Sequence, residues 1–259
     1  MTLRCCAAQV TGLRHRRSAS DGMDRVVYRS TADDEGIVAV LCDGAGSAAH
    51  GGLGAELLSQ TMIEHLAQLS YSTAIAADDW RMQAEFALQR GLAQIAQHAS
   101  AHQRTMREYH STVIAICAYP SWFALYHIGD GMVVSHCAQS QPAYRRRTGA
   151  SYDGPVNETY FATMPHATTY AESMVVIEPW DTLLCASDGI EQVAIDQQHQ
   201  RPFPGFFDPL CRYMQTSPTV ADADVADFLL RDRLQEKCDD DLSLCMIGNR
   251  HSPASHHHT

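Results

Sequence analysis

The sequence predicts a mixed α+β fold in a single domain. Short apolar strands occur in clusters along the chain, and pairs of helical segments separate these clusters. A doubly wound parallel sheet would instead alternate strand and helix one by one, so a mixed architecture is favoured. The 259 residues are 45% hydrophobic and 19% charged, which is enough apolar material for one large core. No linker rich in proline, glycine or serine divides the chain, so residues 1–250 are expected to form one domain.

The strands are predicted from short apolar runs bounded by turn residues. A basic and polar loop, residues 11–23, separates the first two, and a polar stretch at residues 139–157 is expected to be loop. The predicted strands cover residues 3–10, 25–29, 37–41, 112–118, 122–128, 132–137, 158–163, 173–178, 182–186 and 242–247.

The helices are predicted from apolar residues that recur three or four positions apart. This spacing runs through residues 53–69 and continues in residues 78–106, where Asp78 is a plausible N-cap. Residues 190–237 are also helical in pattern, with breaks expected at the prolines, and residues 220–234 are the clearest segment. Two successive helices before the central strands would cover one face of a sheet.

Charge and composition exclude several classes of protein. The formal net charge of −11 argues against nucleic acid or an anionic membrane as the main partner. No apolar run approaches the roughly 20 residues that span a bilayer, and Arg4 interrupts the start of the chain, so no signal peptide is expected. Nine cysteines without a Cys-x-x-Cys pair indicate reduced core thiols and a cytoplasmic location. The histidine-rich tail, residues 251–259, is expected to be disordered.

Three separate places share an acid at the end or start of an apolar strand, with a glycine or a second acid beside it. They are Asp43-Gly44, Asp188-Gly189 and Asp240-Asp241. Each Asp-Gly pair alone is a routine turn. Carboxylates that gather at strand ends repel one another unless cations hold them, so the repeated pattern favours a site for a hard divalent ion such as Mg²⁺ or Mn²⁺.

The glycine-rich loop after residues 37–41 has a rival interpretation as a nucleotide site. A dinucleotide site needs an acid about 20 residues further on, at the end of a second strand. The nearest acid is Glu64, which lies inside the predicted helix 53–69. A phosphate-binding P-loop would need Gly-Lys followed by Ser or Thr, and this is absent, so the nucleotide interpretation is disfavoured.

A set of motifs, in this order along the chain, resembles the metal-dependent protein phosphatases of the 2C type, and most of all their compact bacterial branch. The motifs are Leu41-Cys-Asp-Gly-Ala-Gly-Ser-Ala48, Ser111-Thr112, His127-Ile-Gly-Asp-Gly131, Ala186-Ser-Asp-Gly-Ile190 and Asp240-Asp-Leu-Ser243. They span nearly the whole chain. The resemblance implies a four-layer α-β-β-α sandwich, in which two mainly antiparallel sheets are flanked by helix pairs.

The resemblance also implies an activity and a set of site residues. Members of this family hydrolyse phosphoserine and phosphothreonine with a water activated between two divalent metals, Mg²⁺ or Mn²⁺. Asp43, Asp188 and Asp240 would be the central catalytic acids. Carried over position by position, the metal ligands would be Asp43, bridging both ions, the carbonyl of Gly44, Asp188 and Asp240, with Asp130 on a third and more weakly held ion.

The N-terminal part of the family pattern is less clearly matched. A histidine followed some nine residues later by an acid gives His15 and Asp24, with Asp21 as the alternative acid. An arginine in this region contacts the substrate phosphate in the family, and Arg16 or Arg17 could do so here, although a solvated loop cation is an equally good interpretation of either.

One position departs from the family pattern. Better-known members carry a histidine two residues after the first aspartate, proposed as general acid, and here that residue is Ala45. A metal-bound water or His50 would have to protonate the leaving group, although His50 is more often interpreted as a loop residue. The expected function is a phosphoprotein phosphatase that opposes a serine/threonine kinase. The alternative is a catalytically weak domain of the same fold that binds phosphoproteins in a regulatory role.

Overall fold

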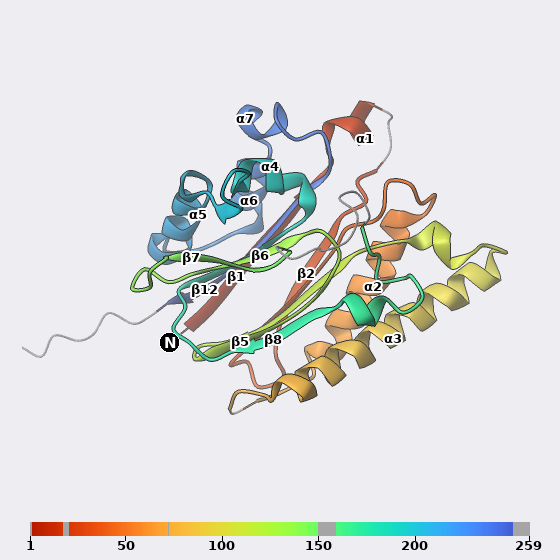
Figure 1. Cartoon of the computed structure of the whole chain (residues 1–259), viewed down its shortest axis with the longest axis horizontal. Helices are drawn as coiled ribbons and strands as arrows, with labels where there is room; N and C mark the ends of the chain where they lie inside the picture. The colour runs from red at the N-terminus through yellow and green to blue at the C-terminus, as the bar shows by residue number, and fades with distance from the viewer. Residues whose placement is uncertain (1, 18–20, 72, 150–158, 251–259) are drawn as a thin grey trace, which may run out of the picture.

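Two β-sheets lie face to face between two layers of helices (Figure 1). The computed structural model describes residues 2–17, 21–71, 73–149 and 159–250. Every pair of neighbouring strands in the two sheets is antiparallel. The predicted α+β sandwich with four layers is therefore confirmed.

Each of the two large sheets has five strands. The first has the order β1 (Thr2–Val10), β12 (Leu242–Arg250), β9 (Thr182–Ala186), β6 (Met132–His136) and β7 (Tyr144–Thr148). The second has the order β2 (Arg25–Ser30), β3 (Ile37–Cys42), β4 (Val113–Tyr119), β5 (Trp122–Ile128) and β8 (Glu172–Val176). A small separate ribbon pairs β10 (Ile195–Asp196) with β11 (Arg201–Pro202).

The helices divide between the two outer faces (Figure 1). The second sheet is covered by α2 (Gly51–Leu66) and α3 (Ala77–Ala101), and the first by α5 (Pro204–Thr216) and α6 (Asp222–Leu229). The shorter helical segments are α1 (Leu13–Arg17), η1 (Met106–Tyr109), η2 (Ala167–Tyr170), η3 (Asp188–Ile190), α4 (Glu191–Ala194) and α7 (Asp232–Gln235). Within the described ranges, no helix has the length and apolar character that crossing a membrane requires.

Three apolar layers hold the sandwich together. Alternate residues of β5 show how one strand serves two of them: Phe123 and Leu125 pack between the sheets, whereas Ala124 and Tyr126 pack under α2 and α3. This follows from the two-residue period of a strand. The third layer lies between the first sheet and its helices, where Phe207 and neighbouring residues are buried. Both faces of the second sheet are covered, so its central strands β3, β4 and β5 are buried along their whole length.

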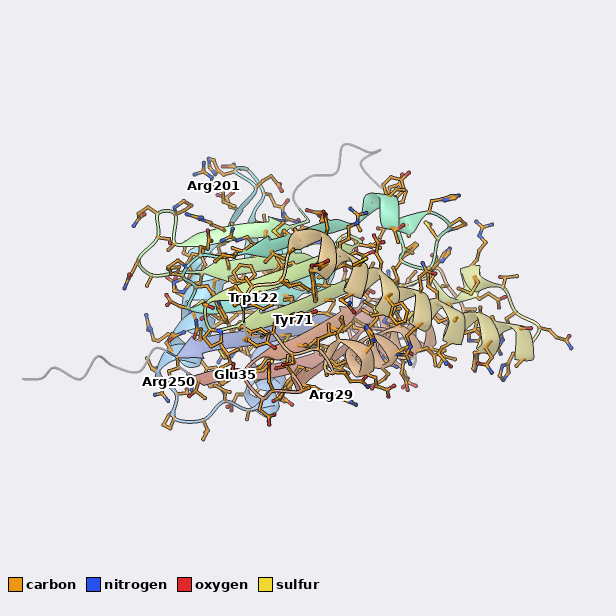
Figure 2. The ribbon with its side chains drawn as sticks, turned by 90° about the horizontal axis from the view of Figure 1, so that it is seen from below. Arg29, Glu35, Tyr71, Trp122, Arg201 and Arg250 are labelled. Atoms are coloured by element: carbon orange, nitrogen blue, oxygen red, sulfur yellow. The ribbon has the colours of Figure 1, made fainter. Side chains whose placement is uncertain are left out.

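An aromatic cluster closes the second sheet at one end. The ring of Trp122 stacks on Tyr119 with centroids 4.8 Å apart, and Tyr71, from the chain between α2 and α3, packs edge-on against Trp122 at 5.9 Å (Figure 2). Trp122 begins β5 and Asp130 follows its end. The cluster therefore lies at the opposite end of the sandwich from Asp130.

Two predicted segments differ from the structure. The polar stretch expected to be loop contains β7, whose sequence Tyr-Arg-Arg-Arg-Thr lacks an apolar pattern. Its arginines are matched by acids that are distant in sequence: Arg145 and Arg147 pair with Glu178, and Arg146 with Glu191. The predicted strand at residues 158–163 is wrong for residues 159–163, which are irregular. Residue 158 and the tail 251–259 lie outside the described residues.

The helix boundaries also shift from those predicted. The second long helix begins at Ala77 with Ala76 as its N-cap, so Asp78 lies in the first turn, and it ends at Ala101, before the expected 106. The segment 220–234 is divided into α6 and α7. All nine cysteines lie in the described ranges and carry no disulfide, and eight of them are buried, as expected for reduced core thiols.

The contact between α2 and α3 gives a first testable prediction. Leu58 on α2 is fully buried, and a Cβ added to Gly91 on α3 would lie 2.6 Å from its Cδ1 atom, so the helices meet closely here. Leu58→Ala is expected to lower the free energy of unfolding by about 2–5 kcal/mol, because it removes buried methyl groups and leaves a cavity. Met82→Ala, at a position 61% exposed on α3, should change it by less than about 0.5 kcal/mol. Urea denaturation of both variants checks this, and equal losses would contradict the packing described.

Candidate metal centre

Five aspartates come together at one end of the sandwich. Asp24 precedes β2, Asp43 follows β3, Asp130 lies between β5 and β6, Asp188 follows β9, and Asp240 precedes β12. In an antiparallel sheet the end of one strand and the start of its neighbour lie at the same edge. The strand order therefore brings these acids to one edge, although they are distant in sequence.

The position of Asp43 is fixed by its backbone. Its N–H donates to the Thr112 hydroxyl at 3.1 Å, and the Thr112 N–H donates to the Asp43 carbonyl at 2.9 Å. Gly44 forms a β-bridge with Ser111. A Cβ on Gly44 would lie 2.4 Å from the carbonyl carbon of Gly51, so only glycine lets the chain turn into α2 at this distance. The Ser-Thr motif of the sequence thus supports the loop that carries Asp43.

Glycine and serine position the other acids in a similar way. Gly129, just before Asp130, has a φ of +132°, which residues other than glycine rarely adopt. Asp188 opens the η3 turn after Ser187, and this turn is joined to β12 by a bond from the Ser243 N–H to the Ser187 hydroxyl at 3.1 Å.

The carboxylates are close enough to share cations. Asp43, Asp130 and Asp188 each offer an oxygen within 4.8 Å of the others. Asp24, only 3% exposed, accepts a hydrogen bond from the Ser243 hydroxyl at 2.7 Å. Asp240 lies at the side of this group, where it adds to the negative potential at Asp188.

Burial and mutual repulsion hold these acids towards their protonated forms. Burial, offset in part by hydrogen bonds from Ser243 and Ser187, raises the pKa of Asp24 to about 6. Burial, followed by the charges of Asp130 and Asp240, raises the pKa of Asp188 to about 7. The pKa of Asp43 is raised well above its usual range by burial and then by Asp24 and Asp188. Such a set suits hard divalent cations, because their charge removes the repulsion and carboxylates are their preferred ligands.

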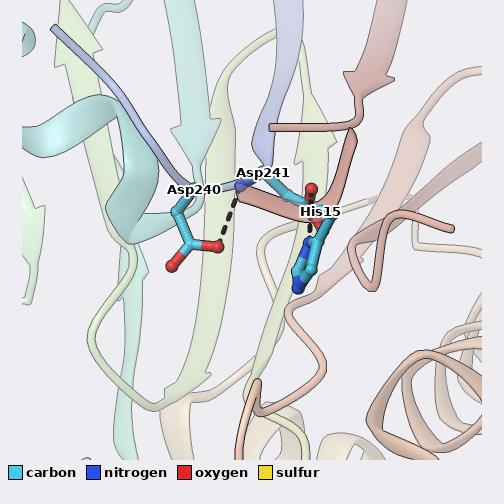
Figure 3. Close-up of side chains that lie close together, drawn as sticks. All are labelled: His15, Asp240 and Asp241. Atoms are coloured by element: carbon cyan, nitrogen blue, oxygen red, sulfur yellow. Dashed lines mark hydrogen bonds and ion pairs between the residues drawn. The ribbon is translucent and has the colours of Figure 1, made fainter. Parts of the chain in front are cut away.

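A second candidate group joins His15, Asp240 and Asp241 (Figure 3). His15 and Asp241 are buried, and the ring Nδ1 lies 2.9 Å from the Asp241 carboxylate. Asp240 points to the other side and accepts a hydrogen bond from the Asp241 N–H at 3.0 Å. The two neighbouring acids therefore face different surroundings.

The structure places the N-terminal acid of the family pattern with the other aspartates, but it does not place Arg16 or Arg17 there. Asp24 lies with Asp43, whereas Asp21 is exposed and lines, with Asp24 and Asp241, a cavity of about 440 Å³. Arg16 donates to the side chain of Gln235, and Arg17 is exposed at the end of α1.

Arg14 is the arginine beside the acids, and sequence reasoning did not single it out. Its guanidinium lies 3.2 Å from the Asp240 carboxylate. Residues two apart on a helix point to nearly opposite sides, so Arg14 and Arg16 cannot both face the centre. The sequence did contain an indication of this role, because Arg14 directly precedes His15, which matches the N-terminal family pattern.

The structure also places the residues considered for proton transfer and for nucleotide binding. Ala45 is buried and its N–H donates to the His110 carbonyl at 2.8 Å. The ring of His50 packs against Tyr109 with centroids 5.5 Å apart. Glu64, the acid that a dinucleotide site would need, is exposed on α2.

Comparisons with known proteins agree with this arrangement. The family model described as protein phosphatase 2C matches residues 11–230. The chain is 23% identical over 210 residues to serine/threonine-protein phosphatase 3 of Escherichia coli (strain K12), covering 80% of this chain and 81% of that protein.

Solved structures share the fold. The serine/threonine phosphatase Stp1 from Staphylococcus aureus matches with a TM-score of 0.64 at 13% identity, over 96% of this chain and 95% of that one. PppA, described as a key regulatory component of T6SS in Pseudomonas aeruginosa, matches with a TM-score of 0.65 at 16% identity, over 96% and 98%.

The family match and the Escherichia coli relative place the chain in the class of phosphoprotein phosphatases. The chain belongs to the protein phosphatase 2C family, which is metal-dependent.

Proposed function

We propose that this protein is a metal-dependent serine/threonine phosphatase that hydrolyses phosphomonoesters on proteins. The observation that carries the proposal is the convergence of five aspartates, three of which have pKa values raised by burial. Removing buried carboxylates from water without a counter-charge is unfavourable, so an arrangement of this kind is stabilised by bound cations. We assign Mg²⁺ or Mn²⁺, with two ions at the centre and a third held more weakly.

We assign different ions to different acids. The proposed ligands are Asp43, the carbonyl of Gly44, Asp188 and Asp240, with Asp130 for the third ion and Asp24 as the N-terminal acid. When bound, such ions lower the pKa of a coordinated water and neutralise charge on the phosphoryl oxygens. The protein keeps the acids in place through two hydrogen bonds, which join the Asp43 backbone to the hydroxyl and the N–H of Thr112, and through the bond between Ser187 and Ser243 of β12.

We propose Arg14 for the substrate phosphate contact that the sequence analysis gave to Arg16 or Arg17. The Arg14 guanidinium already lies at an aspartate of the centre, and its planar donors match two phosphate oxygens. The Arg16 side chain is directed to Gln235, away from Asp240. Of Arg14, Arg16 and Arg17, Arg14 is the one with a described ion pair to an acid of the centre.

The substrates in this proposal are phosphorylated proteins, and the reaction would oppose a serine/threonine kinase. The similarity to serine/threonine-protein phosphatase 3 of Escherichia coli supports this substrate class. The cytoplasmic location stays a prediction from composition.

Ala45 favours one alternative, a weakly catalytic domain that binds phosphoproteins. Its buried methyl group cannot donate a proton to a leaving alkoxide. General acid catalysis contributes roughly 10²- to 10⁴-fold in other enzymes, so its loss would lower turnover without removing phosphate binding.

The experiment that separates these functions uses two substrates of different leaving group. The purified protein with Mn²⁺ is assayed on p-nitrophenyl phosphate and on a phosphothreonine peptide, with EDTA as the control. An active phosphatase hydrolyses both in an EDTA-sensitive way. A site that lacks a general acid loses most on the peptide, because an alkoxide needs the proton more than a nitrophenolate does. Absence of EDTA-sensitive hydrolysis on either substrate would overturn the phosphatase assignment.

A further inference from the structure

Asp241, the neighbour of the proposed ligand Asp240, joins the start of β12 to the basic loop at residues 11–23. It is 3% exposed, and its carboxylate accepts hydrogen bonds from the Gly12 N–H at 2.7 Å, His15 Nδ1 at 2.9 Å and the Met23 N–H at 2.5 Å. The last two donors lie eight positions apart. One carboxylate therefore fixes both the first turn of this loop and its return to β2.

Arg14 lies between the first two of these donors. Its N–H donates to the Asp239 carbonyl at 3.0 Å, and its guanidinium reaches Asp240 at 3.2 Å. On the other side, a Cβ added to Gly46 would lie 2.6 Å from the same guanidinium. The side chain thus extends from the Asp240 segment to the glycine loop that follows Asp43.

The helix that carries Arg14 cannot fix this orientation by itself. α1 has five residues, and so short a helix has little stability alone. The Arg14 side chain is 56% exposed, and a long exposed side chain loses rotamer entropy when it is held in one place. His15 is the buried residue of α1 and its ring meets Asp241 (Figure 3). This contact supplies the anchor that the helix lacks.

We infer that the His15–Asp241 pair is a positioning element that holds Arg14 over the centre, ready to bind a phosphoryl group. This inference rests on the proposed function, and it adds residues that do not themselves touch the substrate. The Asp241 carboxylate suits the role because it accepts all three hydrogen bonds. An asparagine there would turn an amide N–H towards at least one of the three donors.

The test compares three variants with the unmodified protein by a binding measurement that needs no turnover. Inorganic phosphate is titrated into the Mn²⁺-loaded protein by calorimetry. His15→Ala is expected to weaken phosphate binding about tenfold, the size expected for losing a charge-assisted hydrogen bond at Arg14. Arg14→Ala should cause a loss of the same size, and the double variant should bind no more weakly than Arg14→Ala alone, because both changes remove one interaction. Additive losses would overturn the inference.

Two further variants separate positioning from general damage. The amide nitrogen of His15→Asn lies close to where Nδ1 was, so this variant should recover most of the phosphate affinity. His199→Ala removes another histidine–aspartate pair, 2.8 Å from Asp196 on the surface, and should leave affinity unchanged. If His15→Asn binds as weakly as His15→Ala while both melt at the temperature of the unmodified protein, the inference is wrong.

Amide hydrogen exchange tests the geometry without any phosphate. The Gly12 and Met23 amides are protected by Asp241, so they should exchange faster in Asp241→Asn, whereas Arg14→Ala should leave them protected. Unchanged exchange in Asp241→Asn would overturn the inference. A protein that binds phosphate as predicted but hydrolyses nothing would refute the proposed phosphatase activity and leave the positioning element standing.

Discussion

Replacing Asp43 by asparagine is expected to lower Mn²⁺-dependent turnover by about three orders of magnitude. Cations at such a centre contribute several kcal/mol of charge stabilisation in the transition state, and each 1.4 kcal/mol is about tenfold in rate. Asp43 lies among several other acids, since its pKa is raised by burial and then by Asp24, Asp188 and Asp130. Steady-state assays at saturating Mn²⁺ measure the loss.

The same substitution should not unfold the protein. Asparagine has nearly the volume of aspartate, and the two hydrogen bonds between the Asp43 backbone and Thr112 do not involve the side chain that changes. In EDTA the variant should melt at the same temperature as the unmodified protein or higher, because a buried and repelled carboxyl group has been removed. The matched control is Asp79→Asn, an exposed acid in the first turn of α3, which should keep full activity. Near-normal turnover of Asp43→Asn would show that the metal assignment is wrong.

The sequence predicted the acids better than it predicted their surroundings, for a physical reason. Asp43, Asp188 and Asp240 each stand beside an apolar strand, and antiparallel pairing sends alternating strand ends to one edge. Local patterns are therefore enough to predict that they meet. Asp24 directly precedes a predicted strand, but Asp21 stayed as an alternative because the burial that separates the two acids in the structure depends on contacts distant in sequence.

The basic loop shows where sequence patterns fail. Arg14, Arg16 and Arg17 are alike in composition, and which of them faces the centre depends on the one turn of α1 and on its anchor at Asp241. That anchor joins residues more than 200 positions apart. Sequence spacing within the loop carries no information about it.

The prediction of a loop where the structure has strand β7 was wrong for a related reason. Three consecutive arginines predict a solvated loop, because isolated charges are costly to bury. In the structure each of the three arginines pairs with Glu178 or Glu191, so the strand can form the edge of a covered sheet. Residues 159–163 show the reverse: their aromatic and β-branched residues favour a strand, but the Ala162 N–H donates to Ser111 beside the metal centre and the segment stays irregular.

In the absence of metal, the stability of the protein is expected to fall as the pH rises from about 6.5 to 8. The pKa of Asp188 is about 7, and burial with the charges of Asp24 and Asp188 raises the pKa of Asp43 well above its usual range, so both exceed the values in the unfolded chain. Across this range the folded state therefore holds more protons than the unfolded state. Stability then decreases with pH, by about 1.4 kcal/mol per pH unit for each extra proton. Urea unfolding in EDTA at several pH values measures this slope.

The window begins at pH 6.5 because histidines act in the opposite direction below it. Burial, followed by the charge of Arg146, lowers the pKa of His127 to about 3, so the unfolded chain binds more protons at this residue in weak acid. Above 6.5 that contribution fades, since the histidine is increasingly neutral in both states. The decisive comparison is Asp188→Asn, which should flatten the slope in EDTA because it removes one of the retained protons.

Bound cations should reverse this pH dependence. The carboxylates must lose their protons to bind metal, so Mn²⁺ competes with protons at the same groups and binds more tightly as the pH rises. The increase in melting temperature caused by Mn²⁺ is therefore expected to grow from pH 6 to pH 8, over the range in which Asp24 and Asp188 ionise. In Asp188→Asn both the EDTA slope and the Mn²⁺ effect should shrink together. An Mn²⁺ effect that is independent of pH, or an EDTA stability that rises above pH 6.5, would contradict a cation centre built from protonated aspartates.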